Sequence, residues 1–218
     1  DYEDAHVNLG LALSKLGRTD GAIEHYLKAL RINPESDKAH YNLGLEYNNQ
    51  GSINKAIEHY LEALRIKPDY EEAHNNLGFV LYKQGRIEEA IAHYLQALRI
   101  KPDYVEAHNN LGFVLYKQGR SEEAIAHYLQ ALRIMPDYEN AHYNLGNVLY
   151  KQWRTEEAIG HYLQAIRINP ESEKPKNNLG LAFYNQGRIK EAKEQYLNAL
   201  RTNPDFEEAH INLGNVLN

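Results

Sequence analysis

The sequence predicts an all-α protein, an α-solenoid built from stacked pairs of antiparallel helices. Two observations carry this prediction: one phrase recurs every thirty-four residues without insertions, and the apolar residues inside each copy follow helical spacing. Three residue types mark the recurrence. They are the asparagines Asn8, Asn42, Asn76, Asn110, Asn144, Asn178 and Asn212, the glycines Gly10, Gly44, Gly78, Gly112, Gly146, Gly180 and Gly214, and the prolines Pro34, Pro68, Pro102, Pro136, Pro170 and Pro204.

The first element of each repeat is a predicted helix, which in the third copy runs from about Glu72 to Gln84. The Gly85-Arg86 pair that follows predicts a turn, because glycine permits backbone angles that other residues avoid. The apolar residues of this helix share one face at helical spacing: Ala73, Leu77, Val80 and Leu81.

The second element is a predicted helix from about Glu88 to Ile100, which Pro102 ends. Small residues on both helices predict a close crossing of the two backbones, with Tyr94 filling the space between them. The apolar face of the second helix comprises Ala90, Ile91, Tyr94, Ala97 and Leu98.

A single solenoid is expected to span residues 1–218, because each repeat of such an array contacts only its neighbours. The chain begins and ends within a repeat phrase, so we expect it to be a piece of a longer protein or a deliberately trimmed form. The predicted repeats are 3–36, 37–70, 71–104, 105–138, 139–172 and 173–206, followed by a half repeat over 207–218.

Composition excludes several function classes. The net charge of −6 gives no support for a nucleic-acid partner, and no apolar run is long enough to predict a membrane span. The chain has no cysteine, so compartment stays open, with the cytoplasm favoured. The serines do not recur at a fixed spacing from histidine and acidic residues, so a catalytic triad is not expected. The sequence also has no glycine-rich phosphate loop. We therefore expect neither an enzyme nor a bound cofactor. The eleven histidines fall on two rows that we expect at helix edges, and no metal site is predicted.

The repeat resembles the tetratricopeptide repeat along the whole chain. The matching positions in the third copy are Leu77-Gly78, Ala90, Tyr94, Ala97 and Pro102. The resemblance implies a right-handed superhelix whose first helices line a concave groove. One departure recurs, because the family's usual tryptophan in the first helix is replaced. The replacing residues are His6, His40, His74, His108, His142 and His210, with Lys176 in the sixth repeat.

The groove residues are predicted from helical angle. On the first helix of the third repeat they form a stripe opposite Leu77. Across the repeats this stripe gives an amide row, an aromatic row and a partly basic row. The predicted peptide-binding residues are Asn42, Asn76, Asn110, Asn144, Asn178, Asn75, Asn109, Phe79, Phe113, Tyr82, Tyr116, Tyr150, Lys83, Lys117 and Lys151.

These rows suit an extended peptide. A carboxamide offers both a donor and acceptors, so an asparagine row matches a peptide backbone without demanding a particular side-chain sequence. Aromatic side chains add contact area, and lysines favour acidic or phosphorylated segments. The alternative is that the asparagines only cap or bridge adjacent first helices.

The groove pattern also resembles the repeat arm of O-linked N-acetylglucosamine transferase, in which an asparagine ladder holds protein substrates. The phrase carrying this resemblance is Ala73-His74-Asn75-Asn76-Leu77-Gly78. Repeats that clamp chaperone C-termini use lysine and arginine beside the asparagine. Those positions here carry Tyr41, Asn75, Asn109 and Tyr143, so a chaperone-tail clamp is not expected.

Three functions therefore remain open: a non-enzymatic scaffold that binds an extended peptide, a substrate-recruiting arm of a larger enzyme, and a structural protein that self-associates.

Two positions depart from the repeat pattern. Trp153 stands where the other repeats have a turn glycine, and Pro175 falls in a first helical turn where it should be tolerated. A leucine row on the second helices either widens the seam between repeats or lines the outer surface: Leu27, Leu61, Leu95, Leu129, Leu163 and Leu197.

Overall fold

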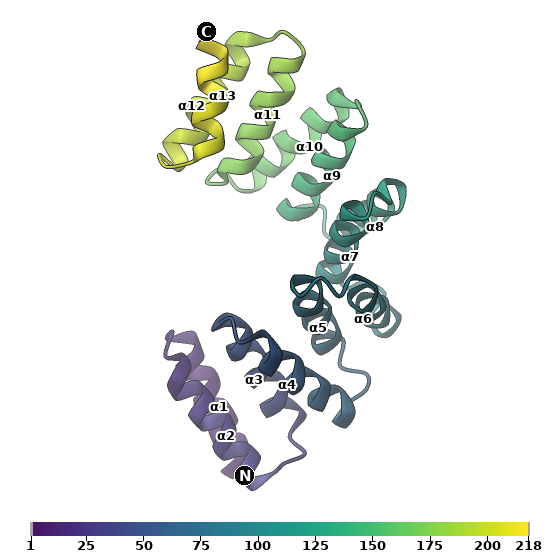
Figure 1. Cartoon of the computed structure of the whole chain (residues 1–218), viewed down its shortest axis with the longest axis vertical. Helices are drawn as coiled ribbons and strands as arrows, with labels where there is room; N and C mark the ends of the chain where they lie inside the picture. The colour runs from purple at the N-terminus through teal and green to yellow at the C-terminus, as the bar shows by residue number, and fades with distance from the viewer. Residues whose placement is uncertain (1, 218) are drawn as a thin grey trace. The chain divides into compact units, whose positions relative to one another are not determined.

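The computed structural model describes residues 2–217, and every regular element in that range is an α-helix (Figure 1). The chain divides into two compact units, residues 1–110 and 111–218, which are described separately. The prediction of an all-α solenoid of helix pairs is confirmed, whereas a single solenoid over the whole chain remains a prediction.

Unit 1 holds three helix pairs in succession. In each pair the first helix packs on the second, and the second packs on the first helix of the next repeat. The helices are α1 (Tyr2–Lys15), α2 (Thr19–Ile32), α3 (Asp37–Asn49), α4 (Ile53–Ile66), α5 (Glu71–Lys83) and α6 (Ile87–Ile100).

Unit 2 repeats the same arrangement, and α7 (Val105–Lys117) contains the division between the units. The sixth repeat begins its helix despite Pro175, as expected for a proline in a first turn. The remaining helices are α8 (Ser121–Ile134), α9 (Glu139–Lys151), α10 (Thr155–Ile168), α11 (Glu173–Asn185), α12 (Ile189–Thr202) and α13 (Glu207–Leu217).

The core of each repeat is a tyrosine packed against a glycine. Tyr94 is almost fully buried, and a methyl group added at Gly78 would lie 2.9 Å from the Cε1 atom of its ring. The same methyl group would lie 3.1 Å from the Ala90 carbonyl oxygen. Close crossing of the two helices therefore requires glycine at this position, as the sequence predicted. The equivalent buried tyrosines are Tyr26, Tyr60, Tyr128, Tyr162 and Tyr196.

The turn inside each repeat needs a left-handed backbone. Gly85 has φ +77°, and the Arg86 amide that follows donates to the Leu81 carbonyl at 3.0 Å. Trp153 holds the same conformation with φ +63°, although its side chain is 87% exposed and gains little packing. The structure thus keeps the turn at the expense of backbone strain in the fifth repeat.

Candidate functional site

The candidate site lies on the first helix of each repeat, on the side opposite the buried Leu77 stripe. We call this side the first-helix face, and define it by the amide row Asn42, Asn76, Asn110, Asn144 and Asn178. Neighbouring first helices contact each other directly, α3 with α5 in unit 1 and α9 with α11 in unit 2. Side chains of the row therefore reach the next repeat.

In unit 1, asparagines bridge adjacent first helices. Asn76 Nδ2 donates to the Tyr41 hydroxyl at 3.0 Å, and Asn110 Nδ2 donates to Asn75 Oδ1 at 3.1 Å. Asn75 in turn donates to Asn76 Oδ1 at 3.4 Å. A carboxamide carries two N–H groups, and these bonds use one of them on Asn76 and on Asn110. The bridging considered as an alternative therefore occurs, and it leaves donor capacity on the face.

Unit 2 repeats the bridge. Asn178 Nδ2 lies 3.4 Å from the Tyr143 hydroxyl and 2.8 Å from Asn147 Oδ1. Asn212 Nδ2 donates to Asn177 Oδ1 at 3.0 Å, and Asn177 donates to Asn178 at 3.2 Å. The bonds donated by Asn178 and Asn212 join residues of different repeats, so they fix the orientation of these amides before any ligand arrives.

Three predicted site residues are placed differently from the rest. Asn42 is buried, and its Nδ2 donates to the Lys38 carbonyl of its own helix at 2.8 Å. Asn75 and Asn109 are also buried, so their side chains support the neighbouring amides from beneath.

The aromatic and basic rows lie towards the C-terminal ends of the first helices. Phe79 is exposed, and the Lys83 ammonium lies 5.3 Å from the centre of its ring. Lys117 lies at 5.4 Å from the Phe113 ring in the same way. Each lysine thus keeps its charge at the surface while its stem covers an aromatic ring. Tyr82 is half-buried beside them.

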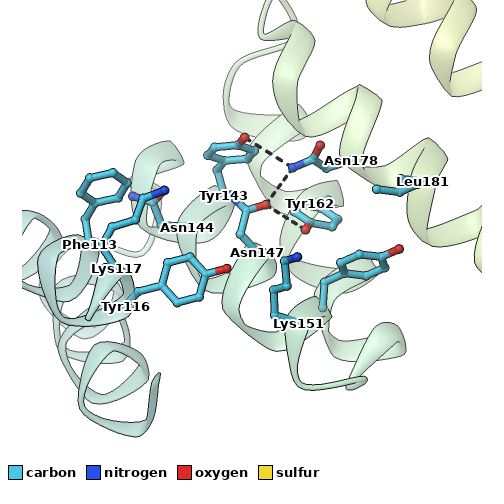
Figure 2. A pocket seen from close by; sticks show the side chains of 11 residues that line it. Phe113, Tyr116, Lys117, Tyr143, Asn144, Asn147, Lys151, Tyr162, Asn178 and Leu181 are labelled. Carbon is cyan, nitrogen blue, oxygen red and sulfur yellow. Dashed lines mark hydrogen bonds between the residues drawn. The ribbon is translucent and has the colours of Figure 1, made fainter. Parts of the chain in front are cut away.

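Unit 2 contains a pocket of about 360 Å³ on this face (Figure 2). Side chains from three successive first helices form it, together with a core tyrosine from α10. The lining residues are Phe113, Tyr116, Lys117, Tyr143, Asn144, Asn147, Tyr150, Lys151, Tyr162, Asn178 and Leu181. The pocket therefore brings together seven of the predicted site residues, Asn144, Asn178, Phe113, Tyr116, Tyr150, Lys117 and Lys151.

Burial changes the acidity of the tyrosines in this pocket. Desolvation raises the pKa of Tyr116 and of Tyr150, and it raises the pKa of the more deeply buried Tyr162 further. Tyrosine hydroxyls are protonated at neutral pH even without these shifts, so the hydroxyls of this pocket are able to donate hydrogen bonds.

The histidine rows pair within repeats, which was not predicted from the sequence because the two rows lie on different helices. The Nδ1 atoms of His40 and His59 lie 3.0 Å apart, and those of His142 and His161 lie 2.9 Å apart. The constant separation of nineteen residues was the available signal. Among residues 2–217, no group of three or more histidine and acidic side chains could hold a metal ion.

The leucine row on the second helices is exposed in both units, with 37–50% of each side chain accessible. Each leucine is thus partly covered and partly accessible, so the row fits both interpretations, a wider seam between repeats and an apolar line on the outer surface. In the described part of the chain, no helix is both long and apolar enough to cross a membrane.

Helix pairs stacked in succession, with bridging amides on one face, define an α-solenoid repeat protein. Models of the TPR repeat match residues 10–51, 44–85, 80–119, 114–152 and 180–217, and a tetratricopeptide repeat model matches 139–172. The chain therefore belongs to the tetratricopeptide repeat family, as the sequence predicted. Such repeats are typically non-catalytic scaffolds for protein interactions. A comparison with curated protein sequences gave no significant match.

Solved structures support the same fold. A chain of the APC/C hetero-tetramer Cut9-Hcn1 gives a TM-score of 0.88 at 17% identity, over 99% of this chain and 43% of that one. The pilF protein of Pseudomonas aeruginosa gives a TM-score of 0.87 at 24% identity, over 98% of this chain and 97% of that protein. YrrB, described as a TPR protein with an unusual peptide-binding site, gives a TM-score of 0.65 at 20% identity, over 85% of this chain and 96% of YrrB. This chain thus spans less than half of the Cut9-Hcn1 chain.

Proposed function

We propose that the chain is a non-catalytic interaction module that holds an extended peptide segment on the first-helix face of each unit. The observation that carries the proposal is the amide row, in which Asn76, Asn110 and Asn178 are oriented by bonds between repeats. Asn76 and Asn110 each keep one N–H that these bonds do not use. An N–H in a fixed position is the partner that a peptide carbonyl requires.

Aromatic and basic side chains beside the amides support the same function. Phe79 and Tyr116 supply flat contact area at small entropic cost, and Lys83 and Lys117 supply charge. In this proposal the amides hold the backbone of the peptide, while the neighbouring rows select its side chains.

The proposal extends to the manner of holding, which is similar to that of the repeat arm of O-linked N-acetylglucosamine transferase. The shared feature is the asparagine row at one residue per repeat. A substrate-recruiting arm of a larger enzyme is therefore the alternative setting for the same peptide-binding face. The sequence flanking residues 1–218 in the full-length protein distinguishes the two settings.

Substitution of the row tests the proposal. Replacing Asn76, Asn110 and Asn144 by alanine should weaken binding of a peptide selected from a random display library by about 1 kcal/mol per residue. Helicity, measured by circular dichroism, should change little. Asn42→Ala is the matched control, because the Asn42 amide is bonded within its own helix. Equal affinity of the parent and the triple variant would remove the row from the site.

A second candidate function is self-association, favoured by the exposed leucine row on the second helices. An apolar line of this kind is a natural contact surface between copies of the chain. It lies on the second helices and leaves the first-helix face available, so the two functions are compatible.

A further inference from the structure

Asn147 distinguishes the unit 2 pocket from the rest of the first-helix face. In the other five full repeats the row that contains it is apolar, with Leu11, Leu45, Phe79, Phe113 and Leu181, while the final half repeat carries Asn215. Asn147 is shorter than the phenylalanines of the third and fourth repeats, and it is polar. It therefore opens a hollow in the row and gives that hollow a hydrogen-bonding floor.

The floor is held in one orientation. Asn147 Oδ1 accepts from the Tyr162 hydroxyl at 2.9 Å and from Asn178 Nδ2 at 2.8 Å (Figure 2). The amide nitrogen of Asn147 has no hydrogen-bond partner among the described residues. In the preceding repeat, where the row carries Phe113, the buried Tyr128 hydroxyl has no partner in the described part of the chain. Asn147 thus accepts a hydrogen bond from the core tyrosine of its own repeat, and these bonds use neither of its two N–H groups.

The remaining polar groups of the pocket are also donors. Figure 2 shows Tyr116 and Lys151 pointing towards the hollow that Asn147 floors. Tyr150 accepts a hydrogen bond from Asn185 Nδ2, which leaves its own O–H to donate. Lys117 completes the set of cations.

The charge of the pocket lining is opposite in sign to the net charge of the chain. The lining includes Lys117 and Lys151 and no aspartate or glutamate, although the chain as a whole carries a net charge of −6. Neither ammonium group has a carboxylate partner among residues 2–217. Phe113 and Leu181 give the pocket apolar walls. Its occupant must therefore accept hydrogen bonds, carry negative charge and have an apolar stem.

We propose that the pocket floored by Asn147 binds an oxyanion-bearing side chain, a carboxylate or a phosphate, of the extended peptide. This inference rests on the proposed peptide-binding function and adds its specificity. The oxyanion lies between Lys117 and Lys151 and accepts from the Asn147 amide, while its stem contacts Phe113. The volume of about 360 Å³ accommodates a single side chain of this kind.

A series of short, end-blocked peptides tests the inference on the full chain. The peptides share one sequence and differ at a central glutamate, glutamine, phosphoserine or phosphotyrosine, and fluorescence anisotropy gives their affinities. We expect at least one anionic peptide to bind roughly tenfold more tightly than the glutamine peptide, because charge-assisted hydrogen bonds are the strong ones. The glutamate and phosphate arms show which oxyanion the pocket prefers. Rising salt should reduce the preference.

Variants locate the preference in this pocket. Lys117→Met and Lys151→Met should each reduce the preference for the anionic peptides over the glutamine peptide. Asn147→Leu, which introduces the residue found in the second and sixth repeats, should abolish this preference. Lys190→Met is the control, because Lys190 is an exposed lysine on the second helix α12, outside the first-helix face, and its variant should keep the preference. Tyr162→Phe tests whether the orientation of the Asn147 amide matters, because it removes only the hydroxyl that donates to Asn147. This variant should weaken the preference for anionic peptides, while circular dichroism should show that the chain remains folded.

Two outcomes would overturn the inference in different ways. Equal binding of the glutamine and anionic peptides would show that the face holds peptides without this subsite, and would leave the proposed function intact. Failure of the parent to bind any peptide of the series or any peptide from a random display library would overturn the proposed function and the inference together.

Discussion

His74 and His93 face each other across the two helices of the third repeat, with their Nδ1 atoms 2.9 Å apart. The Nε2 atom of His74 lies 3.1 Å from the Pro68 carbonyl oxygen, which can only accept. His74 therefore carries its proton on Nε2, and its bare Nδ1 accepts from His93 Nδ1–H. The same reasoning gives the proton positions in the pairs His40–His59 and His142–His161.

This pairing predicts that the protein loses stability in acid. Burial is the main cause that lowers the pKa of His93 and of His161 to about 4, with their histidine partners as the second cause. The unfolded chain, with histidine near 6.5, then binds more protons than the folded chain between pH 6.5 and 4. Stability is fully present above this window and is lost as the pH falls through it. Thermal unfolding followed by circular dichroism across the window should show a steadily falling Tm.

The sixth repeat supplies the control for the acid effect, because Lys176 and Gln195 occupy the two paired positions there. Lys176 Nζ instead donates to the Thr202 hydroxyl at 2.5 Å. Copying this arrangement into the third repeat as His74→Lys, His93→Gln and Ile100→Thr, since Ile100 stands at the position of Thr202, should reduce the dependence of Tm on pH. Glu89 and Arg86 also face His93 and stay unchanged in this variant. An unaltered slope would assign the acid effect to other groups.

Trp153→Gly should raise the free energy of unfolding by about 1 kcal/mol. A residue with a side chain is strained at φ +63°, and glycine relieves that strain, while the exposed indole gives up little packing. Urea unfolding measures the change. The reverse substitution, Gly119→Trp in the preceding repeat, should destabilise the chain by a similar amount. A lower Tm for Trp153→Gly would mean that the indole packs usefully in the native protein.

Two glycines of the fifth repeat should respond to alanine with opposite signs. A methyl group at Gly146 would lie 2.7 Å from the Tyr162 ring, so Gly146→Ala should cost about 1–3 kcal/mol through overpacking. Gly160 lies inside α10 with no atom within 4 Å of the added methyl group, so Gly160→Ala should stabilise by about 0.5–1 kcal/mol. Denaturant midpoints compare the two directly. Similar effects of both variants would contradict the close crossing at Gly146.

The exposed leucine row predicts association that depends on concentration. Changing Leu95, Leu129 and Leu163 to glutamine should weaken it, because these side chains are about half exposed and contribute apolar contact area. Analytical ultracentrifugation over a wide concentration range measures the effect, with circular dichroism as the control for folding. A parent chain that stays monomeric at high concentration would rule out this surface as a self-association site.

Much of the local structure could be predicted from the sequence. The repeat interval, the glycine at each turn and the spacing of Ala73, Leu77 and Tyr94 were enough to give the helix pairs and their buried faces. These features depend on contacts between residues close in the chain, and helical geometry relates such residues by a fixed angle. The first-helix stripe could be predicted for the same reason.

Contacts between helices were decided only by the tertiary structure. The bond from Asn110 to Asn75 joins residues thirty-five apart, and the pairing of His74 with His93 joins residues nineteen apart on two helices. Helical angle gives the direction of a side chain but not the distance or tilt between neighbouring helices, which depends on how Gly78 and Tyr94 pack. The orientation of the Asn147 amide, and with it the donor-lined pocket, therefore follows from packing and could not be obtained from residue spacing.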